Sequence, residues 1–182
     1  QAPHTLMIAD IAALQAMYGV NMQHNTGDNV YTISSFSSQN YIYATIWDAG
    51  GNDTISWAGQ STEASIDLRD GYNSYFGQMV DFREGDWDFE TTFDAGSGVL
   101  GIAHNAIIEN AIGGSATDTI AGNSVGNTLY GGAGEGVGDL LIGGDGADIF
   151  VCSLADASTD LLLTDIVLDF TNGTDFIGLD DR

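Results

Sequence analysis

A nine-residue unit recurs four times between Gly113 and Val151, in the pattern Gly-Gly-x-Gly-x-Asp-x-(large apolar)-x. Its copies read GGSATDTIA, GNSVGNTLY, GGAGEGVGDLLI and GGDGADIFV. Glycines allow positive φ, so their carbonyl oxygens can approach an ion closely, and each aspartate adds a hard anionic oxygen. Such ligands suit Ca²⁺ better than a metal that prefers thiolate or imidazole. The repeat therefore predicts calcium sites in its turns.

The end of each unit supplies the scaffold for these turns. The x-apolar-x triplet predicts a short strand with one inward side chain, which gives a core of Ile120, Leu129, Leu141 and Phe150. Stacked units of this kind form a parallel β-roll, in which successive turns lie on opposite edges and an ion lies between one turn and the turn two units later. A flexible glycine-rich loop is the alternative, but it gives no reason for an apolar residue two positions after each Asp or Asn.

The two edges of this roll are expected to differ. The third unit carries three extra residues, most simply Glu135-Gly136-Val137, which lengthen equally the spacing from Asp118 to Asp139 and that from Asn127 to Asp148. One edge offers two carboxylates, whereas the other includes the neutral Asn127 and should bind calcium more weakly. The residues expected around the ions of the roll are Gly114, Thr117, Asp118, Asn127, Gly132, Gly134, Asp139, Gly144, Gly146 and Asp148.

The charge of the chain supports the same interpretation. Three arginines, no lysine and 26 acidic residues give a formal net charge of −23, and self-repulsion of this size opposes a compact state. About four bound calcium ions would reduce the charge to roughly −15, so the metal-free chain is expected to be partly unfolded. The sequence has no basic patch, which argues against nucleic acid or an anionic membrane as a partner.

The sequence also indicates where the protein works. No apolar run approaches the ~20 residues needed to cross a bilayer, and the N-terminus has no charged-then-apolar export signal. The millimolar calcium that weak sites need is found outside the cell. A secreted, extracellular protein is therefore expected.

The elements that would position the turns are mostly strands. A helix is predicted over Thr5–Tyr18, because Ile8, Ile11 and Leu14 recur at three- and four-residue steps and Gly19 follows. After residue 25, β-branched and aromatic runs such as VYTIS and YIYATIW alternate with Gly, Asn, Asp and Ser, which predicts strands and turns. The chain has 182 residues and is 43% hydrophobic, enough to bury one substantial core.

Four blocks, DIAALQAMYG, NTGDNVY, WDAGGNDTISW and IENAIGGSATDTI, resemble the C-terminal portion of serralysin-type secreted zinc metalloproteases of peptidase family M10, in the same order. The resemblance covers nearly the whole chain. The nonapeptide (RTX) repeat alone is shared with toxins, lipases, adhesins and polysaccharide epimerases. The resemblance implies an all-β fold, in which a parallel β-roll of calcium-binding repeats joins a β-sandwich and one N-terminal α-helix. Residues 1–20 would end a catalytic domain, and residues 21–182 would form the calcium-binding domain.

The resemblance also implies two calcium sites before the repeat. The first would involve Asn25, Gly27, Asn29, Asp48, Gly50 and Asp53, and the second Gly51, Asp53, Ile107 and Glu109. Asn25 stands where the family pattern has Arg, and Ile107 where it has Thr, so both would act through backbone carbonyls. The residues alone also favour DAGGND, a glycine turn bracketed by Asp48 and Asp53.

The zinc signature of that family, H-E-x-x-H-x-x-G-x-x-H, does not occur in this sequence. Its three histidines, His4, His24 and His104, include no i,i+4 pair. Zn²⁺ is therefore expected only in a catalytic part outside this chain, and the chain alone is not expected to be catalytic. A catalytic domain or chain would pack on the N-terminal helix, and type I secretion would export the chain unfolded into calcium-rich surroundings.

Other functions remain open from the sequence. The chain could be a carbohydrate- or protein-binding RTX module of an adhesin or a polysaccharide-modifying enzyme, with the acidic and aromatic segment Tyr72–Asp94 as its contact surface. That segment could equally be a solvated insertion, and a third class is a peptidase with an unrecognised site. Near the C-terminus, Asp165–Leu179 predicts a strand, a glycine turn and a strand, with Asp169 and Asp175 capping the roll or binding another ion.

Overall fold

The computed structural model describes residues 3–32, 41–77, 97–132, 138–153 and 164–180. Within them the chain forms one helix and thirteen strands, which confirms the expected all-β class with one N-terminal helix. The helix is α1 (Ile8–Tyr18), and the strands are β1 (Val30–Tyr31), β2 (Tyr41–Ile46), β3 (Thr54–Ser56), β4 (Ala64–Asp67), β5 (Asn73–Phe76), β6 (Ser97–Ile102), β7 (Asn110–Ile112), β8 (Thr119–Ala121), β9 (Thr128–Tyr130), β10 (Leu140–Ile142), β11 (Ile149–Ser153), β12 (Ile166–Val167) and β13 (Phe176–Asp180). Of the segment Tyr72–Asp94, the part beyond residue 77 lies outside the described residues.

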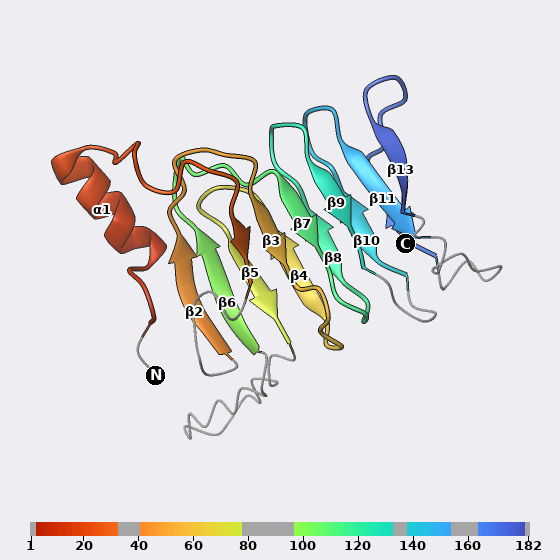
Figure 1. The fold of residues 1–182 in the computed structure, drawn as a ribbon, viewed down its shortest axis with the longest axis horizontal. Coiled ribbons are helices and arrows are strands. Elements are labelled where there is room, and N and C mark those ends of the chain that lie inside the picture. Colours follow the sequence, from red (N-terminus) through yellow and green to blue (C-terminus); the bar gives the residue numbers. More distant parts are fainter. Residues whose placement is uncertain (1–2, 33–40, 78–96, 133–137, 154–163, 181–182) are drawn as a thin grey trace, which may run out of the picture.

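The strands form two sheets that extend from α1 and β2 at one end to β13 at the other (Figure 1). The six-stranded sheet has the order β1-β3-β7-β9-β11-β13 and is parallel throughout. The seven-stranded sheet has the order β12-β10-β8-β4-β5-β6-β2, and only β5 runs antiparallel to its neighbours. From β7 onward, successive strands alternate between the two sheets, so each pair of strands makes one coil of the chain.

The register of these coils follows the repeat. Ala111 pairs with Leu129, which lies two nine-residue units later in the chain. Leu129 pairs with Phe150 and Ile120 with Leu141, and each of these partners lies two units and three further residues later. The three extra residues of the third unit therefore lengthen both pairings that span it. The residues proposed for that insertion, 135–137, lie outside the described part of the chain.

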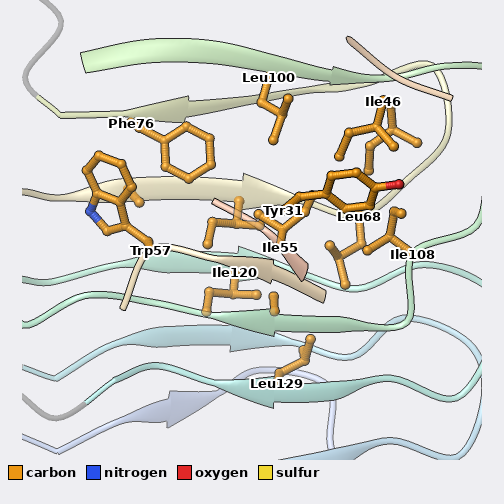
Figure 2. Close-up of a cluster of buried hydrophobic side chains, with 14 of the residues drawn as sticks. Tyr31, Ile46, Ile55, Trp57, Leu68, Phe76, Leu100, Ile108, Ile120 and Leu129 are labelled. Atoms are coloured by element: carbon orange, nitrogen blue, oxygen red, sulfur yellow. The ribbon is translucent and has the colours of Figure 1, made fainter. Parts of the chain in front are cut away.

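The core lies between the two sheets. The predicted residues Ile120, Leu129, Leu141 and Phe150 have exposed fractions of 0%. Toward the N-terminal end the core contains larger side chains, and Figure 2 shows Trp57 and Phe76 beside one another, with ring centroids 4.7 Å apart. Full burial of one such apolar side chain contributes about 1.5–3 kcal/mol, so these rungs hold the coils in register.

The helix begins at Ile8, three residues later than predicted. The preceding residues instead run along the edge strand β2, where the N–H of Thr45 donates to Thr5 Oγ1 at 2.7 Å and the N–H of His4 donates to the Tyr43 carbonyl at 2.6 Å. These hydrogen bonds keep the segment extended, and Met7, at φ −83° and ψ 168°, caps the helix. No residue of α1 is buried. Among the described residues, no helix is long and apolar enough to cross a membrane.

Candidate calcium-binding turns

Aspartates that precede the strands of the seven-stranded sheet connect neighbouring coils. The N–H of Asp118 donates to the Asp139 carboxylate at 2.7 Å, and the N–H of Asp139 donates to Asp165 at 3.0 Å. Asp118 itself accepts the N–H of Ala64 through Oδ1 and the N–H of Gly114 through Oδ2. Asp118 thus fixes both its own turn and the preceding coil, and Asp139 and Asp165 each fix the coil before them. Asp118 and Asp139, predicted to be neighbours on one edge, are brought together.

The six-stranded sheet has the same arrangement at its own edge. In each pair, the backbone N–H of the first residue donates to the carboxylate of the second, which lies one coil later. The pairs are Asn29 with Asp53 (2.8 Å), Asp53 with Glu109 (2.8 Å), Asn127 with Asp148 (2.8 Å) and Asp148 with Asp175 (3.1 Å). Each edge therefore carries a ladder of acidic side chains that are spaced by one coil.

Glycines allow the turns of successive coils to touch. Gly132 has φ +118°, and a Cβ on it would lie 1.9 Å from the carbonyl oxygen of Gly114 one coil earlier. Gly144 has φ +91°, and its Cβ would lie 2.3 Å from the carbonyl oxygen of Asn123. Any side chain at these positions would separate the coils. The turns that contain Gly114 and Gly132 are therefore in direct backbone contact.

A cluster of oxygens forms where the chain enters the first coil. The terminal amide of Asn29 lies 2.8 Å from the Gly27 carbonyl oxygen and 3.3 Å from Asp48 Oδ2. With its nitrogen at that position, Asn29 donates to both oxygens; with its oxygen there, three oxygens converge and require a cation between them. Asp48 is 1% exposed and also accepts hydrogen bonds from the Tyr31 hydroxyl and the Gly50 N–H.

Asp53 stands at the centre of this region. Its side chain is 0% exposed, and among the described residues its Oδ2 atom has no hydrogen-bond partner. Burial raises the pKa of Asp53 to about 6, and the nearby charges of Asp48 and Glu109 also raise it, against the Asn29 N–H, which lowers it. Concentrated negative charge of this kind is unfavourable for a metal-free fold and favourable for a bound cation.

The other predicted residues of the two N-terminal sites differ in what they contribute. Gly50 and Gly51 have φ of +144° and +150°, and a Cβ on Gly51 would lie 2.5 Å from the Gly27 carbonyl oxygen. Asn25 adopts φ +47°, and its amide donates to the Tyr31 hydroxyl at 3.1 Å. The side chain of Ile107 is 47% exposed and is a hydrocarbon without ligand atoms, so only its backbone could act as a ligand.

Three other predicted positions of the repeat differ in their surroundings. Thr117 is exposed, and Gly134 lies outside the described residues. Gly146 has φ +124°, and its Cβ would lie 2.6 Å from the carbonyl oxygen of Val125. It therefore packs on the previous turn as Gly132 and Gly144 do.

Asn127 breaks the ladder of carboxylates. Its Nδ2 donates to the Glu109 carbonyl at 3.0 Å and to Asn123 Oδ1 at 3.2 Å, and its Oδ1 accepts the N–H of Asn123 at 2.8 Å. The Asn123 amide in turn donates to the carbonyls of Leu68 at 3.2 Å and Ile108 at 2.8 Å. At this coil, the side-chain amides of Asn123 and Asn127 therefore donate to backbone carbonyl oxygens that a calcium ion could otherwise contact. The sequence indicated the neutral charge of Asn127 but not the role of Asn123.

The last two coils use acidic residues outside the glycine repeat. Asp148 is 1% exposed, its Oδ2 has no hydrogen-bond partner in the described part of the chain, and burial, Asp175 and Asp169 all raise its pKa. Asp169 accepts the N–H groups of Gly143 and Gly144, each at 2.8 Å. Asp165 was missed by the sequence analysis, although the pattern Asp-x-apolar continues there without the glycines.

In the described residues no three His, Cys, Asp or Glu side chains gather as metal ligands do, in the turns described above or elsewhere. His4 Nδ1 accepts the N–H of Tyr43 at 3.2 Å, and His104 Nδ1 lies 3.7 Å from the Asp70 carboxylate. The turns described above instead combine one or two carboxylates with backbone carbonyls and an amide, which is the ligand set that Ca²⁺ uses.

Comparison with known proteins gives a consistent result. Serralysin G of Dickeya chrysanthemi is 38% identical over 137 residues, which cover 70% of this chain and 24% of that protein. Serralysin of Proteus mirabilis is 36% identical over 132 residues, covering 68% and 23%. Metallopeptidase AprA of Pseudomonas marginalis is 34% identical over 132 residues, covering 68% and 24%. The chain thus spans about a quarter of the length of these relatives.

The family model for the C-terminal part of serralysin, peptidase M10, matches residues 9–84 and 90–181. This match confirms the resemblance seen in the sequence, and it includes all the turns described above. The chain belongs to the family of serralysin C-terminal domains of peptidase M10.

Proposed function

We propose that this chain is the calcium-binding C-terminal domain of a secreted serralysin-like metalloendopeptidase, and that its coils form a β-roll joined to a β-sandwich. Its function is to couple folding, stability and secretion of the parent protein to calcium. The buried, unpartnered oxygens Asp53 Oδ2 and Asp148 Oδ2 are the observation that carries this proposal. An unpaired buried carboxylate oxygen is costly, and a bound cation removes that cost.

Calcium would be held at the two kinds of turn. At the N-terminal turns, the donors are the carbonyl of Gly27 and the side chains of Asn29, Asp48 and Asp53, with Glu109 beside Asp53. At the repeat, the donors are turn carbonyls together with Asp118, Asp139 and Asp148, and the asparagine edge at Asn127 would bind calcium more weakly. When bound, calcium neutralises the acidic groups and holds two successive turns together.

The same chemistry would serve secretion. In a calcium-poor cytoplasm, a chain with a net charge of −23 stays expanded and can be exported by a type I system. Outside the cell, binding energy for the ions becomes folding energy, since the unfolded chain has no preformed sites. Zinc belongs to the catalytic part of the parent protein, and the present chain has no catalytic role.

The catalytic part would pack against α1. The side chains of Leu14, Met17 and Tyr18 are 40%, 65% and 81% exposed, and a cavity of about 470 Å³ between α1 and β2 is lined by residues that include Leu14 and Trp47. Apolar surface of this extent fits an intramolecular domain interface.

Removing calcium tests the proposal directly. With chelator, far-ultraviolet circular dichroism should lose most of its β signal, and restoring calcium should bring the signal and the melting transition back. Magnesium at the same concentration is the matched control, because it demands a smaller octahedral site and should restore much less structure. An unchanged spectrum and melting temperature in chelator would exclude calcium-coupled folding.

A further inference from the structure

An open groove of about 660 Å³ lies at the C-terminal ends of β4, β8, β10 and β12. Ala121 and Ile142, the last residues of β8 and β10, line it, and the turn after β4 contributes Tyr72 to the same groove. Its volume is within the range of sites that bind a small molecule or a short peptide. The carboxylates proposed above as calcium donors, Asp118, Asp139 and Asp148, do not line this groove, although the turn at Gly144 belongs to both.

The charges that line the groove are of one sign. Asp70, Asp145 and Asp169 are all lining residues. Among the described residues that line the groove, the only lysine or arginine is Arg69, whose guanidinium Nε and Nη2 atoms already bind the two carboxylate oxygens of Asp67, at 2.9 and 2.5 Å. Among the described residues, the groove therefore has an excess of negative charge, although the His104 imidazole lies 3.7 Å from the Asp70 carboxylate.

An aromatic ring is fixed beside these carboxylates. The Arg69 guanidinium lies over the Tyr72 ring, 4.1 Å from its centroid, and the bidentate contact with Asp67 holds that guanidinium in place. Tyr72 nevertheless remains 50% exposed. A ring held in this way loses little conformational freedom on binding a ligand, and its electron-rich surface attracts cations.

We propose that this groove binds a basic segment of a polypeptide, with Lys or Arg side chains paired with Asp70 and Asp145 and lying against Tyr72. A neutral ligand, such as an oligosaccharide, would remove water from these carboxylates without neutralising them, which is costly. An ammonium or guanidinium group compensates that loss. The net charge of −23 also draws cationic ligands toward the surface at long range. This role requires only the folded chain, not a catalytic part.

Fluorescence anisotropy of the labelled peptide Gly-Lys-Arg-Gly-Lys-Arg-Gly tests whether the groove binds a basic segment. The measurement is made at saturating calcium. The peptide should bind, and the version with Gln in place of each Lys and Arg should not. Tyr72→Ala and Asp145→Asn should each weaken binding about two- to fivefold, the usual scale of an exposed cation–π contact or ion pair. Two control variants should leave the affinity for the peptide unchanged. Asp10→Asn on α1 also removes one charge. Tyr75→Ala on β5 also removes an exposed ring, and Tyr75 does not line the groove.

Several results would overturn the proposal. If Asp10→Asn weakens binding as much as Asp145→Asn, the attraction is diffuse and involves no groove. If maltohexaose shifts the backbone amide signals of Ala121 and Ile142 in nuclear magnetic resonance while the basic peptide does not, the groove binds saccharides instead. If Tyr72→Ala does not fold in calcium, Asp145→Asn decides the outcome, because Asp145 is an exposed turn residue with no packing role.

Discussion

At the scale of single residues, Asn127 shows how one amide replaces a charge. Its Nδ2 donates to the Glu109 carbonyl of the preceding coil, at a place where the ladder otherwise uses carboxylates. An amide satisfies this carbonyl without a metal, whereas a carboxylate would repel it. The coil boundary between β7 and β9 is therefore held by asparagines, and the boundary between β9 and β11 by Asp148.

Asn127→Asp is expected to separate these two effects. In chelator, the variant should lose about 1–3 kcal/mol of unfolding free energy, since two hydrogen bonds from Nδ2 are lost and a charge is buried. In calcium, the added carboxylate should increase the affinity for calcium, so that the difference in unfolding free energy between the variant and the unchanged chain narrows or reverses. The residual β signal in chelator and urea unfolding at saturating calcium measure the two effects. Asn123→Asp is a comparison at a partly buried position of the same turn. If Asn127→Asp is destabilised equally in chelator and in calcium, that result would contradict a calcium role at this edge.

The raised pKa values of Asp53 and Asp118 lead to a pH prediction for the metal-free chain. Burial raises both to about 6, above the ordinary 3.8 of an unfolded aspartate. Between these values the folded chain binds more protons than the unfolded chain, so protonation favours the fold, and this gain is lost as the pH rises through about 6. Calcium-free protein should therefore retain more β signal in circular dichroism at pH 5 than at pH 7.5.

Calcium should reverse that trend, because protons and calcium compete for the same carboxylates. Calcium affinity is expected to fall as the pH drops below about 6. Asp118→Asn provides the control, since it should flatten the pH dependence of the metal-free chain. Stability that rises from pH 5 to pH 7.5 in calcium-free protein would contradict the assignment of raised pKa values to these buried groups.

At the scale of elements, contact between successive turns depends on glycine. Gly132 and Gly59 both have positive φ, of +118° and +80°, but only Gly132 lies against another backbone. A Cβ on Gly132 would be 1.9 Å from the Gly114 carbonyl oxygen, whereas one on Gly59 would have no atom within 4 Å. The two positions therefore separate the cost of backbone strain from the cost of pushing coils apart.

Gly59→Ala should cost about 1–2 kcal/mol for its left-handed backbone alone. Gly132→Ala should cost at least about 2 kcal/mol more, because the turn of one coil must move off the turn of the other. Urea unfolding at saturating calcium gives the comparison. Equal losses in the two variants would mean that the turns do not stack as described.

The elements also show which sequence signals were sufficient. The Asp-x-apolar pattern predicted β8 to β11 and their four core residues, because one inward side chain per strand is enough to set the register. The start of α1 was misplaced by three residues, because hydrogen bonds between Thr5 and Thr45, 40 residues away in strand β2, compete with helix formation. A local periodicity cannot reveal such a partner.

At the scale of the whole molecule, net charge and specific ion binding make separable contributions. Salt at 1 M shortens the Debye length to about 3 Å and should reduce the self-repulsion of 23 excess negative charges. It cannot supply ligands to Asp53 Oδ2 or Asp148 Oδ2. Screening alone should therefore compact the metal-free chain only partly.

Small-angle X-ray scattering can measure this difference. A compact chain of this length has a radius of gyration of about 16 Å, and an unfolded one about 45 Å. In chelator, 1 M potassium chloride should give an intermediate value, and millimolar calcium at low salt should give the compact one. Full compaction by potassium chloride alone would mean that the acidity acts through repulsion, without specific sites.

The sequence alone determined the all-β class, the inward core residues of the repeat, the equal same-edge spacings of its acidic and amide residues and the serralysin-type family, because these depend on local pattern and on periodic spacing. The tertiary structure decided which oxygens meet. It placed Asn29 against Gly27 and Asp48, brought Asp53 to Glu109 across 56 residues, and gave Asn123 a role in joining coils. Such contacts depend on which coil lies beside which, and that is fixed only when the two sheets close over a common core.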